Sequence, residues 1–304
     1  MLKIVFMGTP SFSVPILEAL IEKYEVIGVV TQPDKLVGRK QIVTFSPVKE
    51  CALKHNLKIF QPEKIRLEYE EILALKPDLI VTAAYGQIVG MKLLNSPKYR
   101  SINVHASLLP KYRGGAPIHK AIMDGEKETG VSIMYMEKQM DAGDILAQKS
   151  IPILDTDNCG TMFEKLSYLG RDLLIETIDK LINNQITPIK QNENDATFAY
   201  NISKEEELLD FSKNATEVFN HIRGLNPNPV AYMMLGEEKL KVYDSVVTNL
   251  KHNYEYGKIY LGEKSKVLVA CGNNTVLELL LVQPSGKKVM SAKDFANGAL
   301  RKYL

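Results

Sequence analysis

An asparagine and a histidine lie two positions apart in SINVHASLLPKYRGG, residues 101–115. The β-branched run that carries Asn103 and His105 predicts a strand, and side chains two apart on a strand project to the same face. A later acidic turn, MDAGDIL, contains Asp141, a candidate partner for His105. An amide donates to a developing oxyanion, an imidazole moves a proton, and a carboxylate orients the imidazole. These residue types together predict proton transfer beside an oxyanion.

This set lacks a protein nucleophile. The sequence has no G-x-S-x-G elbow, and none of Cys51, Cys159 and Cys271 lies near either segment. No H-E-x-x-H pattern or other metal-ligand spacing is present and the five histidines are scattered, so we expect no metal. The nucleophile must therefore come from a substrate, which predicts direct group transfer between two bound molecules. The alternative is that Asn103 and His105 are satisfied polar residues of a core.

The elements that must position these residues follow an α/β pattern. Strand and helix signals alternate through the first ~150 residues, which predicts a mostly parallel sheet with helices on both faces. The carboxyl ends of parallel strands are where open α/β sheets bind ligands, so Asn103 and His105 occupy the expected edge. Strands are predicted at residues 3–7, 24–31, 57–60, 78–83, 101–105, 130–136 and 145–152, and helices at 15–22, 47–55, 68–75, 117–124 and 161–183.

The second part of the chain has a different pattern. Residues 184–202 are polar and aperiodic, and we interpret the first half of this stretch as a linker. A helix is predicted over 214–223, followed by five short strands with Gly and Asn turns, which favour a small barrel of the oligonucleotide-binding type. The predicted division is a catalytic domain at 1–189, a linker at 190–205 and a β-barrel domain at 206–304.

Composition and charge exclude several classes of protein. The 304-residue chain is 45% hydrophobic and 24% charged, and its formal net charge of +2 is too near neutral for a strongly basic nucleic-acid-binding protein. The opening MLKIVFMG is too short for a signal peptide, and no apolar run approaches a membrane span. The first turn, GTPSFS, lacks G-x-G-x-x-G, which argues against nicotinamide chemistry.

The segments NVHASLLPKYRGGAPI and MDAGDIL together resemble the folate-dependent formyltransferases, whose pattern is Asn-x-His, then Ser-Leu-Leu-Pro, then an Asp-x-Gly-Asp turn. Members of that family that act on methionyl-tRNA are similar along nearly the whole chain, through MGTPSFSVPILEALI, VVTQPDKLVGRK, SPVKECA, AAYGQI, ISKEEELLDFSKNA and VQPSGKKVMSAKDFANG. The resemblance implies a Rossmann-like domain with a mostly parallel sheet, followed through a linker by an oligonucleotide-binding-type β-barrel.

The resemblance also implies roles for residues. Asn103, His105 and Asp141 take the catalytic positions. The implied folate-contacting loop is Ser107, Leu108, Leu109 and Pro110, and the residues that border the pterin are Tyr85, Gly86, Gln87 and Ile88. In the loop at residues 31–46, the implied tRNA contacts are Lys35, Arg39 and Lys40. Considered without the family, the same basic residues fit a solvated loop better than a tRNA contact.

The implied reaction is formyl transfer from 10-formyltetrahydrofolate to the α-amino group of methionine esterified to initiator tRNA, for translation initiation. The neutral amine attacks the formyl carbon, Asn103 and protonated His105 stabilise the oxyanion, and Asp141 holds His105. The implied partners are the folate donor and initiator methionyl-tRNA. We expect a monomer in the cytoplasm, with no metal and no membrane association.

Two alternatives remain open from the sequence. A formyltransferase acting on a nucleotide-linked amino sugar would share the same three catalytic residues, although the segments of the second half favour the tRNA enzyme. A catalytically silent tRNA-binding module would have no need of Asn103, His105 and Asp141. The chain departs from the family at Asn228, where a Trp is common, and at Asn201, where a Lys is expected. Lys287, Lys288 and Lys293 fit a basic rim on the barrel and a solvated surface equally well.

Overall fold

The computed structural model describes residues 1–37, 41–298 and 300, so Arg39 and Lys40 lie outside the described residues. The chain divides into two compact units. The first comprises Met1–Pro117, Glu128–Pro152 and Phe163–Tyr200, and the second comprises Ile118–Lys127, Ile153–Met162 and the chain from Asn201 onward. The domain boundaries inferred from the sequence stay a prediction. The second unit includes two short internal segments, Ile118–Lys127 and Ile153–Met162, which lie within residues 1–189 of the sequence.

A seven-stranded sheet organises the first unit, in the order β5-β2-β1-β6-β7-β8-β9. Five of its strands run parallel: β1 Lys3–Gly8, β2 Glu25–Val30, β5 Ile59–Phe60, β6 Leu79–Ala83 and β7 Ser101–His105. β8 Glu128–Tyr135 and β9 Ile145–Pro152 complete it in antiparallel pairing. Every residue of β6 is buried, as expected for a strand with helices on both faces. The predicted Rossmann-like, mostly parallel sheet is confirmed.

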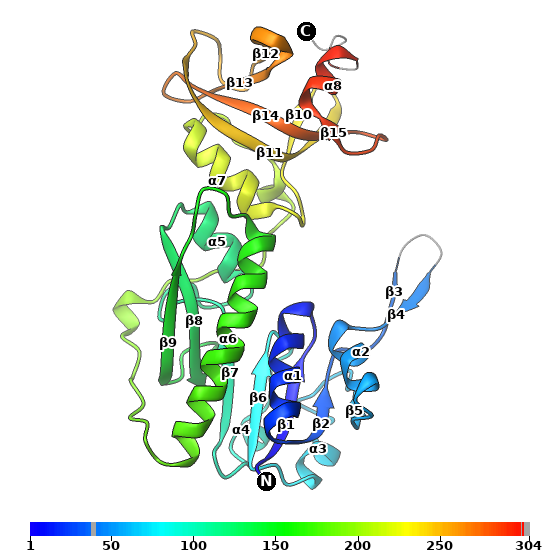
Figure 1. Ribbon diagram of the computed structural model, residues 1–304, viewed down its shortest axis with the longest axis vertical. Coiled ribbons are helices and arrows are strands. Elements are labelled where there is room, and N and C mark those ends of the chain that lie inside the picture. Colours follow the sequence, from blue (N-terminus) through cyan, green and yellow to red (C-terminus); the bar gives the residue numbers. More distant parts are fainter. Residues whose placement is uncertain (38–40, 299, 301–304) are drawn as a thin grey trace. The chain divides into compact units, whose positions relative to one another are not determined.

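Helices pack against this sheet and set the position of β7. The first unit contains α1 Val14–Lys23, α2 Pro47–Lys54, α3 Glu70–Ala74, α4 Met91–Leu94 and most of α6 Cys159–Ile182. Figure 1 shows α1 and α6 lying over one face of the sheet. On α6, a Cβ at Gly170 would come within 2.8 Å of Val104 Cγ1 in β7. The glycine therefore lets α6 approach the strand that carries Asn103 and His105.

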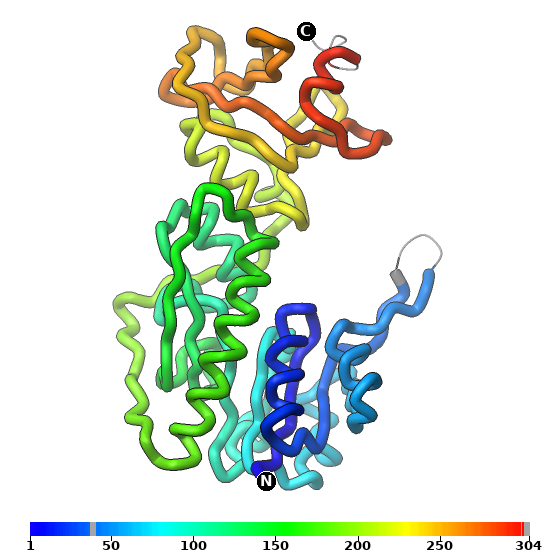
Figure 2. The backbone as a smooth tube through the Cα atoms, viewed as in Figure 1, coloured from blue at the N-terminus to red at the C-terminus, as the bar shows by residue number. Residues whose placement is uncertain are grey.

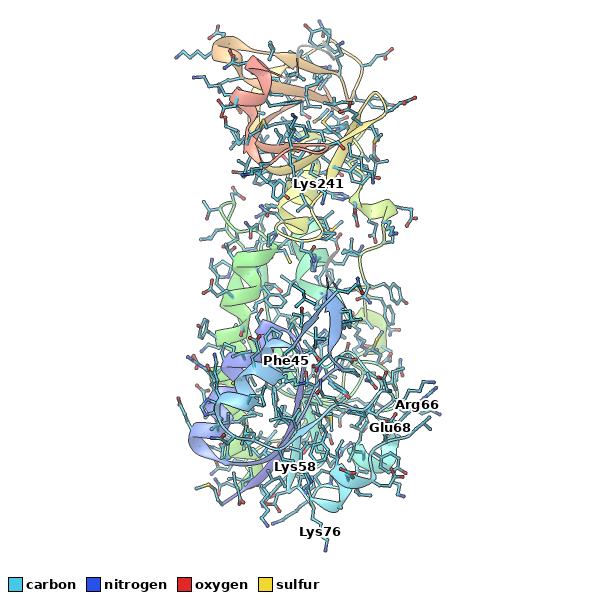
Figure 3. All side chains as sticks on the ribbon, turned by 90° about the vertical axis from the view of Figure 1, so that its right-hand side faces the viewer. Phe45, Lys58, Arg66, Glu68, Lys76 and Lys241 are labelled. Atoms are coloured by element: carbon cyan, nitrogen blue, oxygen red, sulfur yellow. The ribbon has the colours of Figure 1, made fainter. Side chains whose placement is uncertain are left out.

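One part of the predicted loop at residues 31–46 is a hairpin. β3 Lys35–Val37 and β4 Ile42–Thr44 pair in antiparallel fashion and project from the sheet in Figure 1. These two strands lack the alternation of buried and exposed side chains that a half-buried strand shows, since the apolar side chains of Leu36 and Ile42 are each 60% exposed. After β4 comes Phe45, which is labelled in Figure 3. The Lys49 ammonium nitrogen lies over its ring, 4.0 Å from the centroid.

The second unit is built on an antiparallel sheet in the order β10-β11-β14-β13-β12, with β15 paired to β14. Its elements are α5 Pro117–Met123 (from Ile118), α7 Ala215–Leu225, β10 Tyr232–Leu235, β11 Glu238–Lys251, β12 Ile259–Leu261, β13 Val267–Cys271, β14 Thr275–Pro284, β15 Met290–Ser291 and α8 Ala292–Asn297. Register shifts along the β11–β14 pair curl the sheet. The predicted small β-barrel domain is confirmed as this curled sheet, although β15, α8 and α4 were not predicted.

The second unit has its own core and a defined start. Residues buried between α7 and the sheet include Val218, Ile222, Val242 and Leu277. The start of α7 is fixed by a capping box, in which the Asn214 side chain accepts from the backbone N–H of Glu217 while that glutamate accepts in return. Among the described residues, no helix combines the length and apolarity needed to cross a bilayer.

Candidate active site

The imidazole of His105 is held from two sides at the end of β7. Its Nε2 lies 2.9 Å from the Tyr112 carbonyl oxygen, and its Nδ1 lies 3.6 Å from Asp141 Oδ2. A carbonyl can only accept a hydrogen bond, so Nε2 carries a proton and Nδ1 is the nitrogen that gains or loses one. The Asp141 contact is longer than a hydrogen bond, so Nδ1 can still donate to a substrate.

Asp141 is fixed by its neighbours rather than by its place in a regular element. Its Oδ2 accepts from the backbone N–H of Gly114 at 2.9 Å, and its backbone has a positive φ of 51°. The side chain is only 15% exposed. The structure therefore brings together His105 and Asp141, which are far apart in the sequence, as the acidic turn predicted.

Asn103 is oriented by the adjacent strand. Thr82 of β6 lies opposite it in the ladder, and Thr82 Oγ1 donates to Asn103 Oδ1 at 2.7 Å. With Oδ1 engaged, the amide Nδ2 has no partner in the described part of the chain, so it can donate to a developing oxyanion. Asn103 and His105 are alternate residues of β7, as predicted, and share one face of the sheet.

The loop at residues 107–110 is held by β8 and β9. The fully buried Ser107 hydroxyl donates to the Lys111 carbonyl at 2.7 Å, so this hydroxyl shapes the loop from within. Ser132 of β8 accepts from the Leu109 N–H at 3.1 Å, and Gln148 of β9 donates to the Leu109 carbonyl at 2.9 Å. Leu109 is buried, while Leu108 and Pro110 are partly exposed. The loop is therefore a rigid edge beside His105.

Connections that follow three parallel strands meet at Tyr85. The Tyr85 carbonyl accepts from Thr9 Oγ1 at 2.9 Å and from Gln32 Nε2 at 3.1 Å. Gln87 in turn accepts from the Ile65 N–H at 2.9 Å. Three of the segments used for the resemblance, MGTPSF, VVTQPDK and AAYGQI, therefore form one continuous edge.

Within this edge the Tyr85 side chain is buried but incompletely satisfied. It is 4% exposed, and its hydroxyl has no hydrogen-bond partner among the described residues. Burial raises the pKa of Tyr85, so the phenol keeps its proton as a donor. Beside it, Gly86 has a φ of 87°, which favours glycine, and Ile88 is 83% exposed. A buried hydroxyl without a partner among the described residues is a donor that a polar ligand could use.

Sequence reasoning missed a buried arginine that connects the site loops. Arg113 is 0% exposed, and its Nη2 donates to Gln191 Oε1 at 2.9 Å and to Glu193 Oε1 at 2.8 Å. The Gln191 amide donates in turn to the carbonyls of Asp141 at 2.8 Å and Gly143 at 2.7 Å. The Arg113 guanidinium lowers the pKa of the Glu193 carboxyl. This network ties the loop after β7 to the turn that carries Asp141.

The network depends on the stretch that the sequence indicated as a linker. Figure 2 shows residues 183–200 returning from the end of α6 beside β9, where Ile189 pairs with Ile145. Arg113 also accepts from the Ala199 N–H at 2.7 Å, and Gln191 and Ala199 are buried. A polar stretch without periodicity gives no indication that it packs against the domain. The only sign of this network in the sequence was an arginine within KYRGG.

Replacing Gln191 by methionine is expected to reduce the free energy of unfolding by about 3 kcal/mol or more, because it leaves two carbonyls and part of a guanidinium unsatisfied at ~1–3 kcal/mol per group. It should also lower kcat more than it raises either KM, since Asp141 loses a constraint. Chemical denaturation and steady-state kinetics measure the two effects. Lys190→Ala, at the exposed position before Gln191, is the matched control. Unchanged kcat in Gln191→Met would show that the network is structural only.

The basic residues predicted after β2 are only partly placed. Lys35 lies in β3 and is exposed, and it takes no part in the hydrogen bond that holds His105. At the base of the hairpin, Asp34 pairs with Lys49 at 2.6 Å and accepts from Gln61 at 2.8 Å. Lys49, and secondarily Gln61, lower the pKa of the Asp34 carboxyl. The base of the hairpin is thus fixed, whereas the predicted residues 39 and 40 lie outside the described residues.

The comparisons with known proteins identify the family of the chain. Residues 2–178 match the model of the formyl transferase family, and residues 201–300 match that of the formyl transferase C-terminal domain. Methionyl-tRNA formyltransferase of Bacillus subtilis (strain 168) is 54% identical over 302 residues, covering 98% of this chain and 95% of that protein. Methionyl-tRNA formyltransferase of Bacillus mycoides (strain KBAB4) is 53% identical over 301 residues, covering 98% and 96%.

Solved structures share the fold at lower identity. The N-formyltransferase from Helicobacter canadensis, in complex with folinic acid and dTDP-3-aminofucose, has a TM-score of 0.71 at 22% identity and covers 93% of this chain and all of that one. HypX from Aquifex aeolicus, in complex with tetrahydrofolic acid, has a TM-score of 0.67 at 15% identity, covering 98% of this chain and 47% of that one. From the match of both family models and the identity to these relatives, the chain belongs to the formyl transferase family.

Proposed function

We propose that this enzyme transfers the formyl group of 10-formyltetrahydrofolate to the α-amino group of methionyl-initiator tRNA, giving formylmethionyl-tRNA for translation initiation. The observation that carries the proposal is the His105–Asp141 pair beside Asn103 at the end of β7, in a chain that matches methionyl-tRNA formyltransferases over 98% of its length. The proposed site binds two substrates, the folate donor and the charged tRNA. We expect the enzyme to act in the cytoplasm and as a monomer.

The side chains divide the reaction between them. Attack by the neutral amine on the formyl carbon forms the new C–N bond and puts negative charge on the formyl oxygen, where Asn103 Nδ2 and the protonated Nδ1 of His105 donate. When the tetrahedral species collapses, the bond to N10 of the folate breaks. The proton lost by the amine passes to N10, with His105 and its paired Asp141 as the relay. Formyl transfer is thus balanced without a protein nucleophile.

The proposed folate contacts fit what the residues offer. The buried Tyr85 hydroxyl without a partner in the described chain offers a hydrogen bond to a pterin edge, and Ile88 offers an apolar surface. On the other side, the loop at residues 107–110 presents a fixed backbone, since Ser132 and Gln148 hold it. The role of Ser107 in this proposal is to shape the loop, because its hydroxyl is already bound to Lys111.

Lys35, Arg39 and Lys40 are the proposed phosphate contacts for the tRNA. Replacing Arg39 by alanine should weaken tRNA binding and reduce the slope of log K against log salt by about one counterion, or ~0.7–0.9. Lys76→Ala, an exposed lysine that Figure 3 shows pointing away from the first unit, is the control with unchanged slope. Fluorescence titrations from low to moderate salt measure the slopes. Equal slopes for wild type and Arg39→Ala would contradict a phosphate contact.

The rival function is formylation of a nucleotide-linked amino sugar, the chemistry named for the Helicobacter canadensis structure's ligands. A formylation assay decides between them by offering charged initiator tRNA and amino-sugar nucleotides side by side with 10-formyltetrahydrofolate. Transfer to the methionyl-tRNA alone is expected. Transfer to the sugar alone would overturn the proposal, and tight tRNA binding without any transfer would indicate a silent binding module.

A further inference from the structure

Three side chains outside the proposed active site bring sulfur, nitrogen and oxygen donors together. Glu18 lies on α1, Cys51 lies on α2, and His55 follows the end of α2. One ligand atom from each residue lies within 4.8 Å of the other two. Cys51 and His55 are four residues apart, a spacing that puts both side chains on the same face of a helix.

None of the three side chains is engaged by another described residue. In the part of the chain that the structure describes, Glu18 and His55 make no side-chain hydrogen bond or ion pair, and the Cys51 thiol has no hydrogen-bond partner. Cys51 is 4% exposed, whereas Glu18 and His55 are exposed. The sulfur thus lies at the base of the cluster and the other two donors lie at its solvent side, which leaves an ion a path of entry.

We propose that Glu18, Cys51 and His55 form a binding site for a zinc ion that links α1 to α2, with water as the fourth ligand. A thiolate, an imidazole and a carboxylate are together a donor set of zinc, whereas magnesium and calcium take oxygen ligands. One thiolate and one carboxylate also balance the charge of a divalent cation. This site departs from the sequence-based expectation of no metal, because C-x-x-x-H alone offers only two ligands.

The geometry requires only a small closure. In a tetrahedral zinc site the donor atoms are about 3.6 Å apart, from Zn–S and Zn–N bonds of ~2.3 and ~2.1 Å. The donors here are within 4.8 Å, so they need to approach by about an ångström. Exposed Glu18 and His55 can make that adjustment by side-chain rotation, while the buried Cys51 stays in place.

A cation at the cluster would have ligands ready to bind it. The Cys51 sulfur and the Glu18 carboxylate have no competing partner among the described residues, so a bound zinc ion would satisfy both groups. The ion would also hold the helix whose N-terminus ends the 31–46 connection, where Ser46 contacts Thr31 at 2.7 Å.

Cobalt titration of the reduced, metal-free, full-length protein tests the site, because cobalt bound to a thiolate gives an intense charge-transfer absorption. We expect one cobalt ion per chain with this band, and its loss when zinc is added. His55→Gln and Glu18→Gln should each weaken binding by at least ~10- to 100-fold. Each removes one of three protein ligands, and loss of a group that only orients a ligand already costs that much. Both positions are exposed, so these variants are expected to fold normally.

Cysteine variants identify the sulfur. Cys51→Ala should abolish the band, whereas Cys159→Ala should retain it, since Cys159 belongs to no comparable ligand group among the described residues. The proposal is overturned if wild-type protein shows no band, if Cys51→Ala keeps it, or if His55→Gln and Glu18→Gln bind as tightly as wild type. Zinc binding is measured directly, so these outcomes do not depend on whether the protein formylates tRNA.

Discussion

Replacing His105 by alanine is expected to lower kcat by about 100- to 10,000-fold, the usual contribution of a positioned acid–base group. The imidazole is held by the Tyr112 carbonyl and paired with Asp141, so its Nδ1 is set for one proton-transfer role. Without it, the tetrahedral intermediate loses a donor and the amine proton loses its relay. Steady-state kinetics with methionyl-tRNA and the formyl donor measure the effect, with KM values changing much less than kcat.

A second histidine separates this catalytic effect from general destabilisation. His252 is also buried and bonds the Cys271 carbonyl at 2.8 Å, but it follows β11 in the second unit. His252→Gln should therefore lower thermal stability while kcat of the folded enzyme stays within about twofold. Near-normal turnover in purified, folded His105→Ala would remove this residue from the mechanism.

Asn103→Ala should lower kcat by about 100- to 1,000-fold, because removing one oxyanion donor typically costs that much. A second variant with a smaller expected effect is Thr82→Val. It keeps the shape of the Thr82 side chain but removes the hydroxyl that orients the Asn103 amide. One neutral hydrogen bond contributes ~0.5–1.5 kcal/mol, so Thr82→Val should lower kcat only about 2- to 13-fold. The order of the two effects is the test of the orienting role.

Circular dichroism and thermal unfolding would show whether either variant is folded. If Asn103→Ala turned over at near-wild-type rate, the oxyanion would have to be stabilised by other donors, such as backbone N–H groups. If Thr82→Val instead lost as much activity as Asn103→Ala, the threonine hydroxyl itself would contact the reacting atoms. Each result assigns the amide and the hydroxyl to different roles.

Much of the fold could be predicted from local patterns in the sequence. The β-branched run over residues 101–105 predicted β7 with the observed bounds, and β9 was likewise predicted as Ile145–Pro152. Buried parallel strands are readable because both of their faces require apolar side chains. The hairpin of β3 and β4 was not predicted, since Leu36 and Ile42 remain exposed and give no burial pattern.

The sequence by itself determined the family, the order of the elements and the pairing of Asn103 with His105, because strand periodicity and short motifs are local properties of the chain. Only the tertiary structure decided the buried link from Arg113 through Gln191, 78 residues away, to Asp141, and the meeting of Glu18 with Cys51 and His55. Such groupings depend on how strands and helices pack across long separations. Spacing along a polar or amphipathic segment does not encode which distant side chain it will meet.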